Sequence, residues 1–400
     1  MNLLRNPDLK LLLVYLLLVV CQLLRILGDP VGFTATDSFY YLEAARNLVL
    51  GNGPVTPAFP NAEVPDTSQI VYLTAFPIGY PLGIAAVSWA TGVSVFWASK
   101  VVNLLALGGA LLVLRKFCRA NAWLLALAFG TFTQLEVFAY TWSEGLFTFL
   151  LLLFGYLLYQ LVRGRAGALF ALFAGVTGCL LFLVKYIGVF GLGLLVLAAL
   201  YCWRNNRKAQ ARWLVLATFG IGVFIALYLG LNYYLRGLTW GGDRIFNSGK
   251  SVGHFVSAIS RGVFNELNLM RHYYFRGRFD PLFFVLLAVQ VMWLGLIYWR
   301  LIRHKISLRV QATDELPKFF WLVAGVYFAS LIGLRLLSPF DAFYYRLMAP
   351  ASLFFYLGIL ALLASPERTQ KSPKLKVHLA LLLLFCLLFQ LPKAWLLSFI

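Results

Sequence analysis

Uninterrupted apolar stretches, about as long as a bilayer is thick, recur from one end of this 400-residue sequence to the other. A hydrocarbon core of ~30 Å takes roughly 20 helical residues to cross. A backbone in lipid must satisfy its own hydrogen bonds, which long continuous runs do as helices. The chain is 61% hydrophobic and 12% charged, whereas a soluble domain carries about 25% charged residues. The sequence therefore predicts an all-α polytopic membrane protein.

We expect a single domain over residues 1–400, with eleven membrane-spanning helices. The apolar stretch 80–91 is too short to span and is predicted to be interfacial or re-entrant. Two long loops interrupt the spans, at about residues 28–94 and 235–281, and loops of this length in a compact bundle are usually functional. The expected spans lie near residues 11–27, 95–114, 121–140, 144–162, 166–184, 186–203, 213–234, 282–299, 319–337, 347–364 and 377–397.

The distribution of Lys and Arg predicts a cytoplasmic N-terminus and places both long loops outside. In this orientation 20 of the 34 basic residues fall in short cytoplasmic segments, and the net charge is +16 inside and +3 outside. Topology thus accounts for most of the net charge of +19, so no nucleic-acid partner is expected. We expect a multi-pass protein of a cell membrane, such as a bacterial inner membrane, in contact with its lipids. The five cysteines form no C-x-x-C pair, which argues against a zinc site or a disulfide framework.

An acidic residue, Asp37, begins an amphipathic segment in the first long loop. Tyr40, Tyr41 and Ala44 recur at helical spacing, and Gly51-Asn52-Gly53-Pro54 is a typical C-terminal stop. This pattern predicts a helix in the membrane interface with aromatic anchors near its start. Asp37 could cap that helix, or it could act as a general base at the membrane surface.

A second acid, Glu144, stands at the start of an expected span, directly after Ser143. It could simply favour the positive end of the helix, or it could take part in chemistry. Glu136 competes with it, because an ionisable group at membrane depth is a functional candidate. Basic residues on the outer side suit an anionic lipid headgroup, especially phosphate, although anchoring of helix ends would use the same residue types. The basic residues of this kind are Lys185, Arg335, Arg346 and, in the second long loop, Arg236, Arg244, Lys250, Arg261, Arg271, Arg276 and Arg278.

The order of these features resembles the GT-C superfamily of membrane glycosyltransferases. More narrowly, it is similar to the branch containing protein O-mannosyltransferases and the lipid A aminoarabinose transferase. One departure from the family lies before the turn at Pro77. Relatives often have a basic residue there, whereas this sequence has Ala75 and Phe76. The similarity lies in four motifs, which are Asp37-x-x-Tyr40-Tyr41-x-x-Ala44 with Gly51-Asn52-Gly53, Phe76-Pro77-Ile78-Gly79-Tyr80-Pro81-Leu82, Ser143-Glu144-x-Leu146-Phe147 and Tyr345-Arg346-x-Met348-Ala349-Pro350.

The resemblance implies a polyprenyl-phosphate-linked sugar as donor and a hydroxyl of a lipid, protein or glycan as acceptor. By matching position, Asp37 would be the catalytic carboxylate, and Glu144 would help to bind or position the substrate. The donor phosphate would be held by outer basic residues, for which Lys185, Arg261, Arg271 and Arg346 are the candidates. We also expect Tyr40, Tyr41 and Tyr345, which belong to the matching motifs, to line the substrate pocket.

The expected reaction is a single displacement that inverts the anomeric centre. The sequence has no nucleotide-binding glycine loop and identifies no cofactor, and the alternative of a divalent metal stays open. A transporter or flippase of a lipid-linked or anionic substrate is the main alternative. It would need charges near the bilayer midplane and internal repeats, whereas the candidate charges here lie at the outer rim. A third alternative is a scaffold subunit whose outer loops bind a partner protein.

Overall fold

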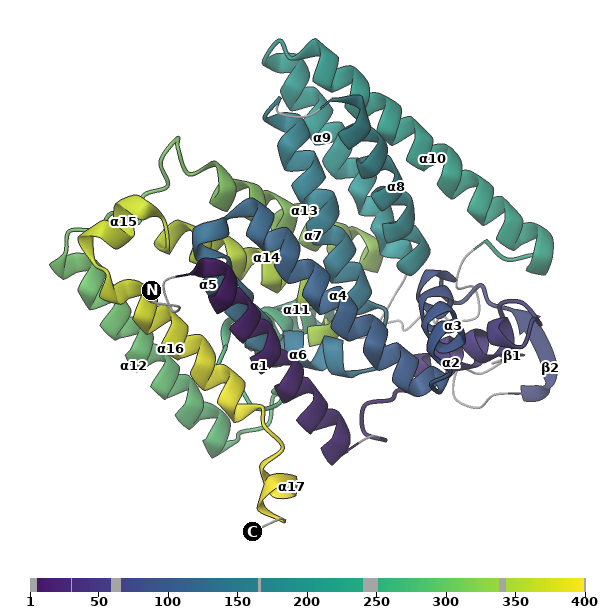
Figure 1. Ribbon diagram of the computed structural model, residues 1–400, viewed down its shortest axis with the longest axis horizontal. Coiled ribbons are helices and arrows are strands. Elements are labelled where there is room, and N and C mark those ends of the chain that lie inside the picture. Colours follow the sequence, from purple (N-terminus) through teal and green to yellow (C-terminus); the bar gives the residue numbers. More distant parts are fainter. Residues whose placement is uncertain are drawn as a thin grey trace.

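The computed structural model describes residues 6–29, 31–58, 66–164, 167–239, 251–337 and 343–398. These residues form helices almost throughout, with one two-stranded sheet at one edge (Figure 1). The elements are α1 (Pro7–Gly28), α2 (Thr36–Val49), β1 (Val55–Ala58), β2 (Asp66–Tyr72), α3 (Gly79–Thr91), α4 (Val95–Phe117), η2 (Arg119–Asn121), α5 (Ala122–Ala126), η3 (Leu127–Gly130), α6 (Phe132–Ala139), α7 (Glu144–Val162), α8 (Ala168–Val184), η4 (Tyr186–Val189), α9 (Phe190–Arg204), α10 (Lys208–Arg236), α11 (Val252–Leu267), α12 (Pro281–Arg303), α13 (Glu315–Leu337), α14 (Tyr345–Leu363), α15 (Pro366–Lys371), α16 (Lys374–Phe389) and α17 (Lys393–Leu397).

Capping residues explain where several of the long helices begin and end. The side chain of Asn6 accepts a hydrogen bond from the first turn of α1, and that of Asp280 does the same for α12. In both helices a proline follows the cap, where its missing N–H costs nothing. Helix α10 ends at Gly237, whose φ of 72° is a left-handed conformation that favours glycine.

Within the described residues, eight helices are long and apolar enough to cross a membrane, or nine if the bent pair between Arg119 and Ala139 forms one span. The multi-pass, all-α character is therefore confirmed. The expected number of eleven spans is not confirmed. Helices α8 and α16 occupy two more of the expected segments, but they have only 17 and 16 residues, fewer than the roughly 20 that a full crossing takes.

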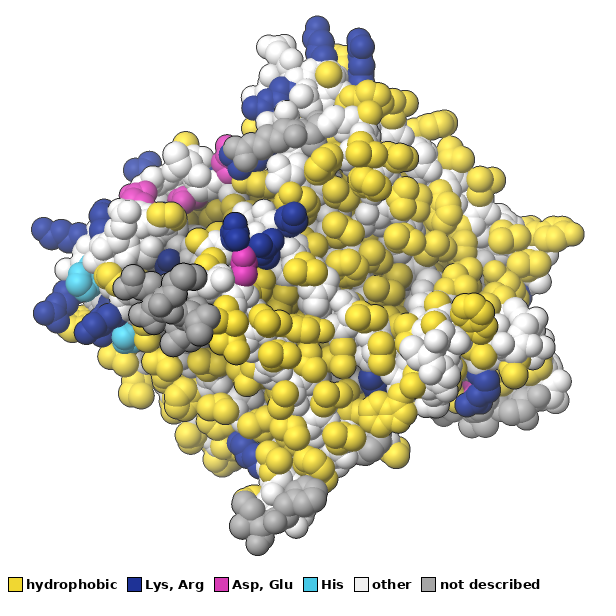
Figure 2. All heavy atoms as spheres, viewed as in Figure 1, with side chains coloured by type: hydrophobic (Ala, Val, Ile, Leu, Met, Phe, Trp, Pro, Cys, Tyr) yellow, Lys and Arg dark blue, Asp and Glu magenta, His cyan; other side chains and the backbone are white. Residues whose placement is uncertain are grey.

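The outer surface of the bundle is apolar over much of its area. Figure 2 shows hydrophobic side chains covering most of the visible face, with Lys and Arg gathered at the top and along the left edge. On α10, at the edge of the bundle, Leu216, Phe219 and Leu227 are exposed. Continuous exposed apolar surface marks a contact region for lipid or protein, and a bundle of apolar helices presents it to lipid.

The segment expected to span at 121–140 is not one straight helix. It bends by 76° between Gly130 and Phe132, because Thr131 has an extended backbone, with φ −74° and ψ 154°. The chain resumes as the eight-residue helix α6, every residue of which is buried. Helix α6 packs against α1, α4 and α14, so it lies inside the bundle.

The first long loop contains the two helices that the sequence predicts. Helices α2 and α3 share a small aromatic core with the start of α4, in which the rings of Tyr41 and Tyr80 lie 5.1 Å apart in a T-shaped arrangement. Between them, β1 and β2 form an antiparallel hairpin that pairs Val55 with Tyr72. The apolar face of α2 is therefore packed on protein, and this packing holds the start of α2 beside the main bundle.

Candidate functional site

Four charged side chains from distant parts of the sequence meet at one end of the bundle. Asp37 comes from the first turn of α2, Glu144 begins α7, Lys185 follows α8, and Arg346 lies in the first turn of α14. The Arg346 guanidinium forms ion pairs with both carboxylates, through Nη2 to Asp37 and through Nε to Glu144. Lys185 Nζ donates to Glu144 Oε1 at 2.6 Å. We call these four residues the charge cluster.

Burial differs strongly within the charge cluster. The Glu144 side chain is fully buried, whereas those of Asp37, Lys185 and Arg346 are 11%, 16% and 22% exposed. A buried carboxylate is tolerated when cations and hydrogen-bond donors surround it, and Glu144 has two cations. Burial lowers the pKa of the Lys185 ammonium, and the Glu144 carboxylate opposes that effect. Glu144 is thus the most deeply buried member of the charge cluster, and the side chains of Asp37, Lys185 and Arg346 are slightly exposed.

The cap of α2 is not supplied by Asp37. The helix begins after Ala35, and the backbone N–H of Ala35 donates to Ser38 Oγ at 2.9 Å. Ser38 Oγ also donates to the carbonyl of Thr141 at 3.0 Å, which fixes α2 to the turn before α7. The carboxylate of Asp37 is directed to Arg346 instead. Asp37 is therefore not the cap of α2, and its catalytic role remains a prediction.

Trp142 supports the charge cluster and was not anticipated from the sequence. Its ring is 5% exposed, and the Arg346 guanidinium lies 4.8 Å from the ring centroid. On the other side, the ring of Tyr140 stacks on Trp142 at 4.0 Å. A cation held over an aromatic face gains about 0.5–2 kcal/mol, so this stack restrains Arg346. The available signal was a tryptophan two residues before Glu144.

The three tyrosines predicted to line a pocket occupy two different environments. Tyr40 and Tyr41 are 5% and 1% exposed and pack on Phe76. The hydroxyl of Tyr41 lies 3.2 Å from Ser143 Oγ, which places it directly behind the charge cluster. Tyr345 is partly exposed, with its ring 6.1 Å from that of Trp142. Contact with a substrate remains a prediction for all three, and Tyr345 is the best placed to make it.

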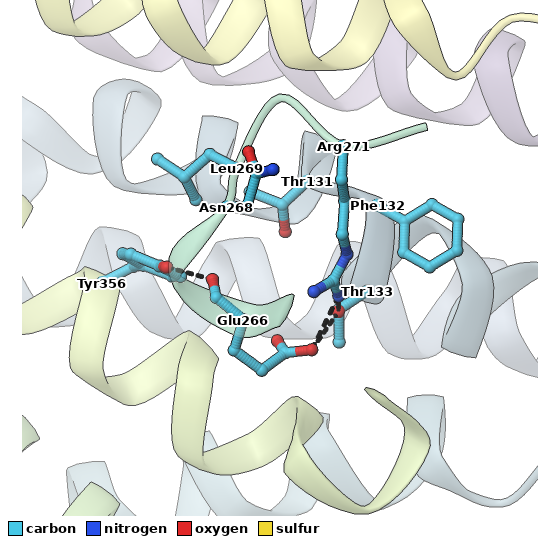
Figure 3. Close-up of a pocket in the computed structure, with 8 residues that line it drawn as sticks. All are labelled: Thr131, Phe132, Thr133, Glu266, Asn268, Leu269, Arg271 and Tyr356. Carbon is cyan, nitrogen blue, oxygen red and sulfur yellow. Dashed lines mark hydrogen bonds and ion pairs between the residues drawn. The ribbon is translucent and has the colours of Figure 1, made fainter. Parts of the chain in front are cut away.

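Two of the predicted phosphate-binding residues lie outside the charge cluster. Arg271 is 2% exposed and forms an ion pair with Glu266 at 2.7 Å, with Thr133 as a further partner (Figure 3). Arg261 is exposed on α11 and donates to the carbonyl of Arg276 at 3.4 Å. Their binding of phosphate remains a prediction, and the structure gives it no support from geometry.

Arg271 borders a small polar pocket, which Figure 3 shows in close-up. Within the described structure, Arg271 Nε and Nη1 and both amide atoms of Asn268 are buried without a hydrogen-bond partner. Buried groups of this kind are normally paired or hydrated, so the pocket has the chemistry of an ordered-water site. It is lined by Thr131, Phe132, Thr133, Glu266, Asn268, Leu269, Arg271 and Tyr356.

The competing acid Glu136 belongs to a separate ion pair. It lies on α6 and contacts Arg25, from the last turn of α1, with both side chains about one-tenth exposed. The Arg25 guanidinium also lies 5.2 Å from the ring centroid of Phe33. Among the described residues, no group of three or more His, Cys, Asp or Glu side chains is arranged to hold a metal ion.

The chain was compared with family models, curated proteins and solved structures. No family model and no curated protein matches the sequence. ArnT from Cupriavidus metallidurans, in the apo state, aligns with a TM-score of 0.44 and 14% identity, over 87% of this chain and 76% of that chain. A TM-score below 0.5 is too low to support an argument about function, so the proposals below rest on contacts within this chain.

Proposed function

We propose that this chain is a membrane glycosyltransferase. It moves a sugar from a polyprenyl-phosphate donor to a hydroxyl acceptor at the outer face of the membrane. The observation that carries this proposal is the charge cluster, in which two candidate phosphate-binding cations meet two candidate catalytic carboxylates. Asp37 and Glu144 are the acids, and Lys185 and Arg346 are the cations.

We place the charge cluster on the outer side, and its position on the helices supports this. It lies where α7 and α14 begin and where α8 ends. Asp8, near the start of α1, pairs instead with Arg115 and Arg119 at the far end of α4, on the side with the greater positive charge. Reporter fusions within residues 251–275 should read as outside, and fusions after Arg212 as cytoplasmic. A cytoplasmic signal from 251–275 would remove the basis for outer-face chemistry.

The chemistry follows from the charges in the cluster. The acceptor hydroxyl oxygen attacks the anomeric carbon while the bond from that carbon to the phosphate oxygen breaks. The electron pair leaves with the polyprenyl phosphate, and Lys185 and Arg346 stabilise the charge that develops there. The hydroxyl proton passes to the Asp37 carboxylate, acting as general base. One displacement inverts the anomeric centre, and no cofactor enters the step.

Glu144 has a supporting role in this mechanism. It holds the two cations at one point and thereby fixes where the phosphate binds. Its second oxygen, Oε2, is buried and has no hydrogen-bond partner in the described part of the chain.

The proposal is tested by mass spectrometry of glycolipids and envelope glycans from a deletion strain. We expect one glycan modification to disappear and its lipid-linked donor to accumulate. Wild-type protein should restore the modification, and the Asp37→Asn variant, at equal abundance, should not. Full restoration by Asp37→Asn, with donor that stays on the cytoplasmic side in the deletion strain, would indicate a flippase and reject the proposal.

A further inference from the structure

Lys100 is a buried lysine whose three hydrogen bonds all go to neutral oxygens. It lies in the second turn of α4 and is 1% exposed. Its Nζ donates to the carbonyl of Phe33 at 3.1 Å, to the carbonyl of Ala139 at 2.8 Å and to Thr141 Oγ1 at 2.9 Å. An ammonium has three donors and no acceptor, so these contacts use its full capacity. Buried lysines are rare unless paired, and within the described residues Lys100 has no carboxylate partner.

The three acceptors belong to the two segments that carry the proposed catalytic carboxylates. Phe33 lies four residues before Asp37, in the chain that leads into α2. Ala139 is the last residue of α6, and Thr141 lies in the turn between α6 and α7, just before Glu144. The backbone N–H of Thr141 donates to the Phe33 carbonyl at 3.2 Å, so the two segments touch at the point where Lys100 binds them both.

The neighbours of Lys100 on α4 reinforce this junction. Ser99 Oγ lies 2.9 Å from Thr141 Oγ1, and Asn103 Nδ2 donates to the carbonyls of Phe138 and Tyr140 at 3.1 and 2.8 Å. These bonds reach only the end of α6 and the turn before α7. Lys100 is the member of the group that also reaches the segment before α2. It therefore joins the two segments, in addition to the Thr141–Phe33 backbone bond and the bond from Ser38 to Thr141.

We propose that Lys100 is a positioning residue that sets the separation of Asp37 and Glu144, and thereby allows Arg346 to contact both. The consequence for catalysis rests on the proposed function, whereas the consequence for structure does not. A misplacement of about 1 Å at a catalytic group costs about 100-fold in rate. Loss of the Lys100 contacts should therefore lower kcat. The donor KM should stay unchanged, because Lys185 and Arg346 retain Glu144.

The experiment compares Lys100→Met with Lys116→Met. Both changes remove one lysine from α4, but Lys116 is exposed in the last turn. Hydrogen exchange is measured on the purified proteins in lipid nanodiscs, over residues 33–38 and 139–144. Loss of a charge-assisted hydrogen bond should speed exchange in both segments of Lys100→Met by about 10-fold or more, with no change in Lys116→Met. Thr141→Val, which removes one of the three acceptors, is the milder variant should Lys100→Met fail to fold.

The activity measurement separates this proposal from the proposed function. Faster exchange confined to the two segments, together with a lower kcat at unchanged donor KM, supports positioning by Lys100. Unchanged exchange, acceleration spread over the whole chain, or a raised KM with normal kcat would each overturn it. If the wild-type protein transfers no sugar, the proposed function fails, and the exchange data still decide whether Lys100 joins the segments.

Discussion

Replacing Asp37 by asparagine tests the proposed general base with a minimal change of shape. The amide has the size of the carboxylate, but at neutral pH it cannot take a proton from the hydroxyl of the acceptor substrate. The cap of α2 is unaffected, because Ser38 supplies it. Arg346 keeps its ion pair with Glu144, so no cation is left without a partner. Folding and membrane insertion should therefore survive.

The substitution has two expected effects, one on the rate and one on stability. Loss of a general base lowers the rate by ~10²–10⁴-fold, which corresponds to about 2.7–5.4 kcal/mol in the activation barrier. The same substitution removes one charge-assisted contact to Arg346, worth about 1.5–3 kcal/mol of stability when buried and less here, because the Asp37 side chain is 11% exposed. The loss of activity should greatly exceed any loss of folded protein.

The assay uses the lipid-linked sugar that accumulates in the deletion strain and purified variants in vesicles, at equal folded amounts by size-exclusion chromatography. Glu43→Gln is the matched control. It makes the same acid-to-amide change on α2, where Glu43 forms an exposed pair with Arg46 worth at most about 1 kcal/mol. Near wild-type turnover in Asp37→Asn, or an equal loss in Glu43→Gln, would refute the general-base assignment.

Three further changes test the surrounding charges. Glu144→Gln removes the buried carboxylate that Lys185 and Arg346 share. Thermal unfolding in detergent should show a destabilisation of about 3–5 kcal/mol, and an unaltered unfolding temperature would contradict the role of Glu144 in holding the two cations. Arg346→Lys loses the fork that contacts two acids at once, so steady-state kinetics should show a donor KM raised by roughly 10- to 150-fold, whereas an unchanged KM would exclude Arg346 from the phosphate site. On the opposite side, hydrogen bonds from Arg368 lower the pKa of Asp314. This contact therefore stabilises the fold at pH values above the unfolded-state pKa of about 3.9. The stabilisation is lost as the pH falls through the lower pKa of the folded state. The difference in unfolding temperature between wild type and Asp314→Asn should shrink over that acidic window, and a constant difference would show that the contact contributes nothing.

The sequence predicted the parts of this molecule that depend on local pattern. The spacing of Tyr40, Tyr41 and Ala44 indicated α2, and the helix runs from Thr36 to Val49. Glu144 and its neighbours were recognisable because an acid at the start of an apolar run is conspicuous. The structure brings Asp37, Glu144, Lys185 and Arg346 into contact, although no pattern in the chain states which basic residue meets which acid.

The remaining features depend on tertiary contacts. Nothing in the composition of residues 121–140 indicates the bend at Thr131, because an extended residue there is stable only when neighbouring helices bury both sides. Arg271 was predicted to bind phosphate because it lies in an outer loop, yet Glu266 in the same loop already pairs with it. Lys100 did carry a usable signal, since an ionisable residue in an apolar helix is a functional candidate.

The early end of α6 at Ala139, where Tyr140 has an extended backbone, also explains polar residues of two otherwise apolar helices. Because α6 stops inside the bundle, its last carbonyls have no helical N–H to accept from, and lipid offers none. Asn103 on α4 donates to the carbonyl of Phe138, and Lys100 donates to that of Ala139. Gln22 on α1 adds a hydrogen bond to the carbonyl of Leu135, in the middle of α6, at 2.9 Å. A helix that is interrupted within the bundle thus requires hydrogen-bond donors at matching positions of the intact helices beside it.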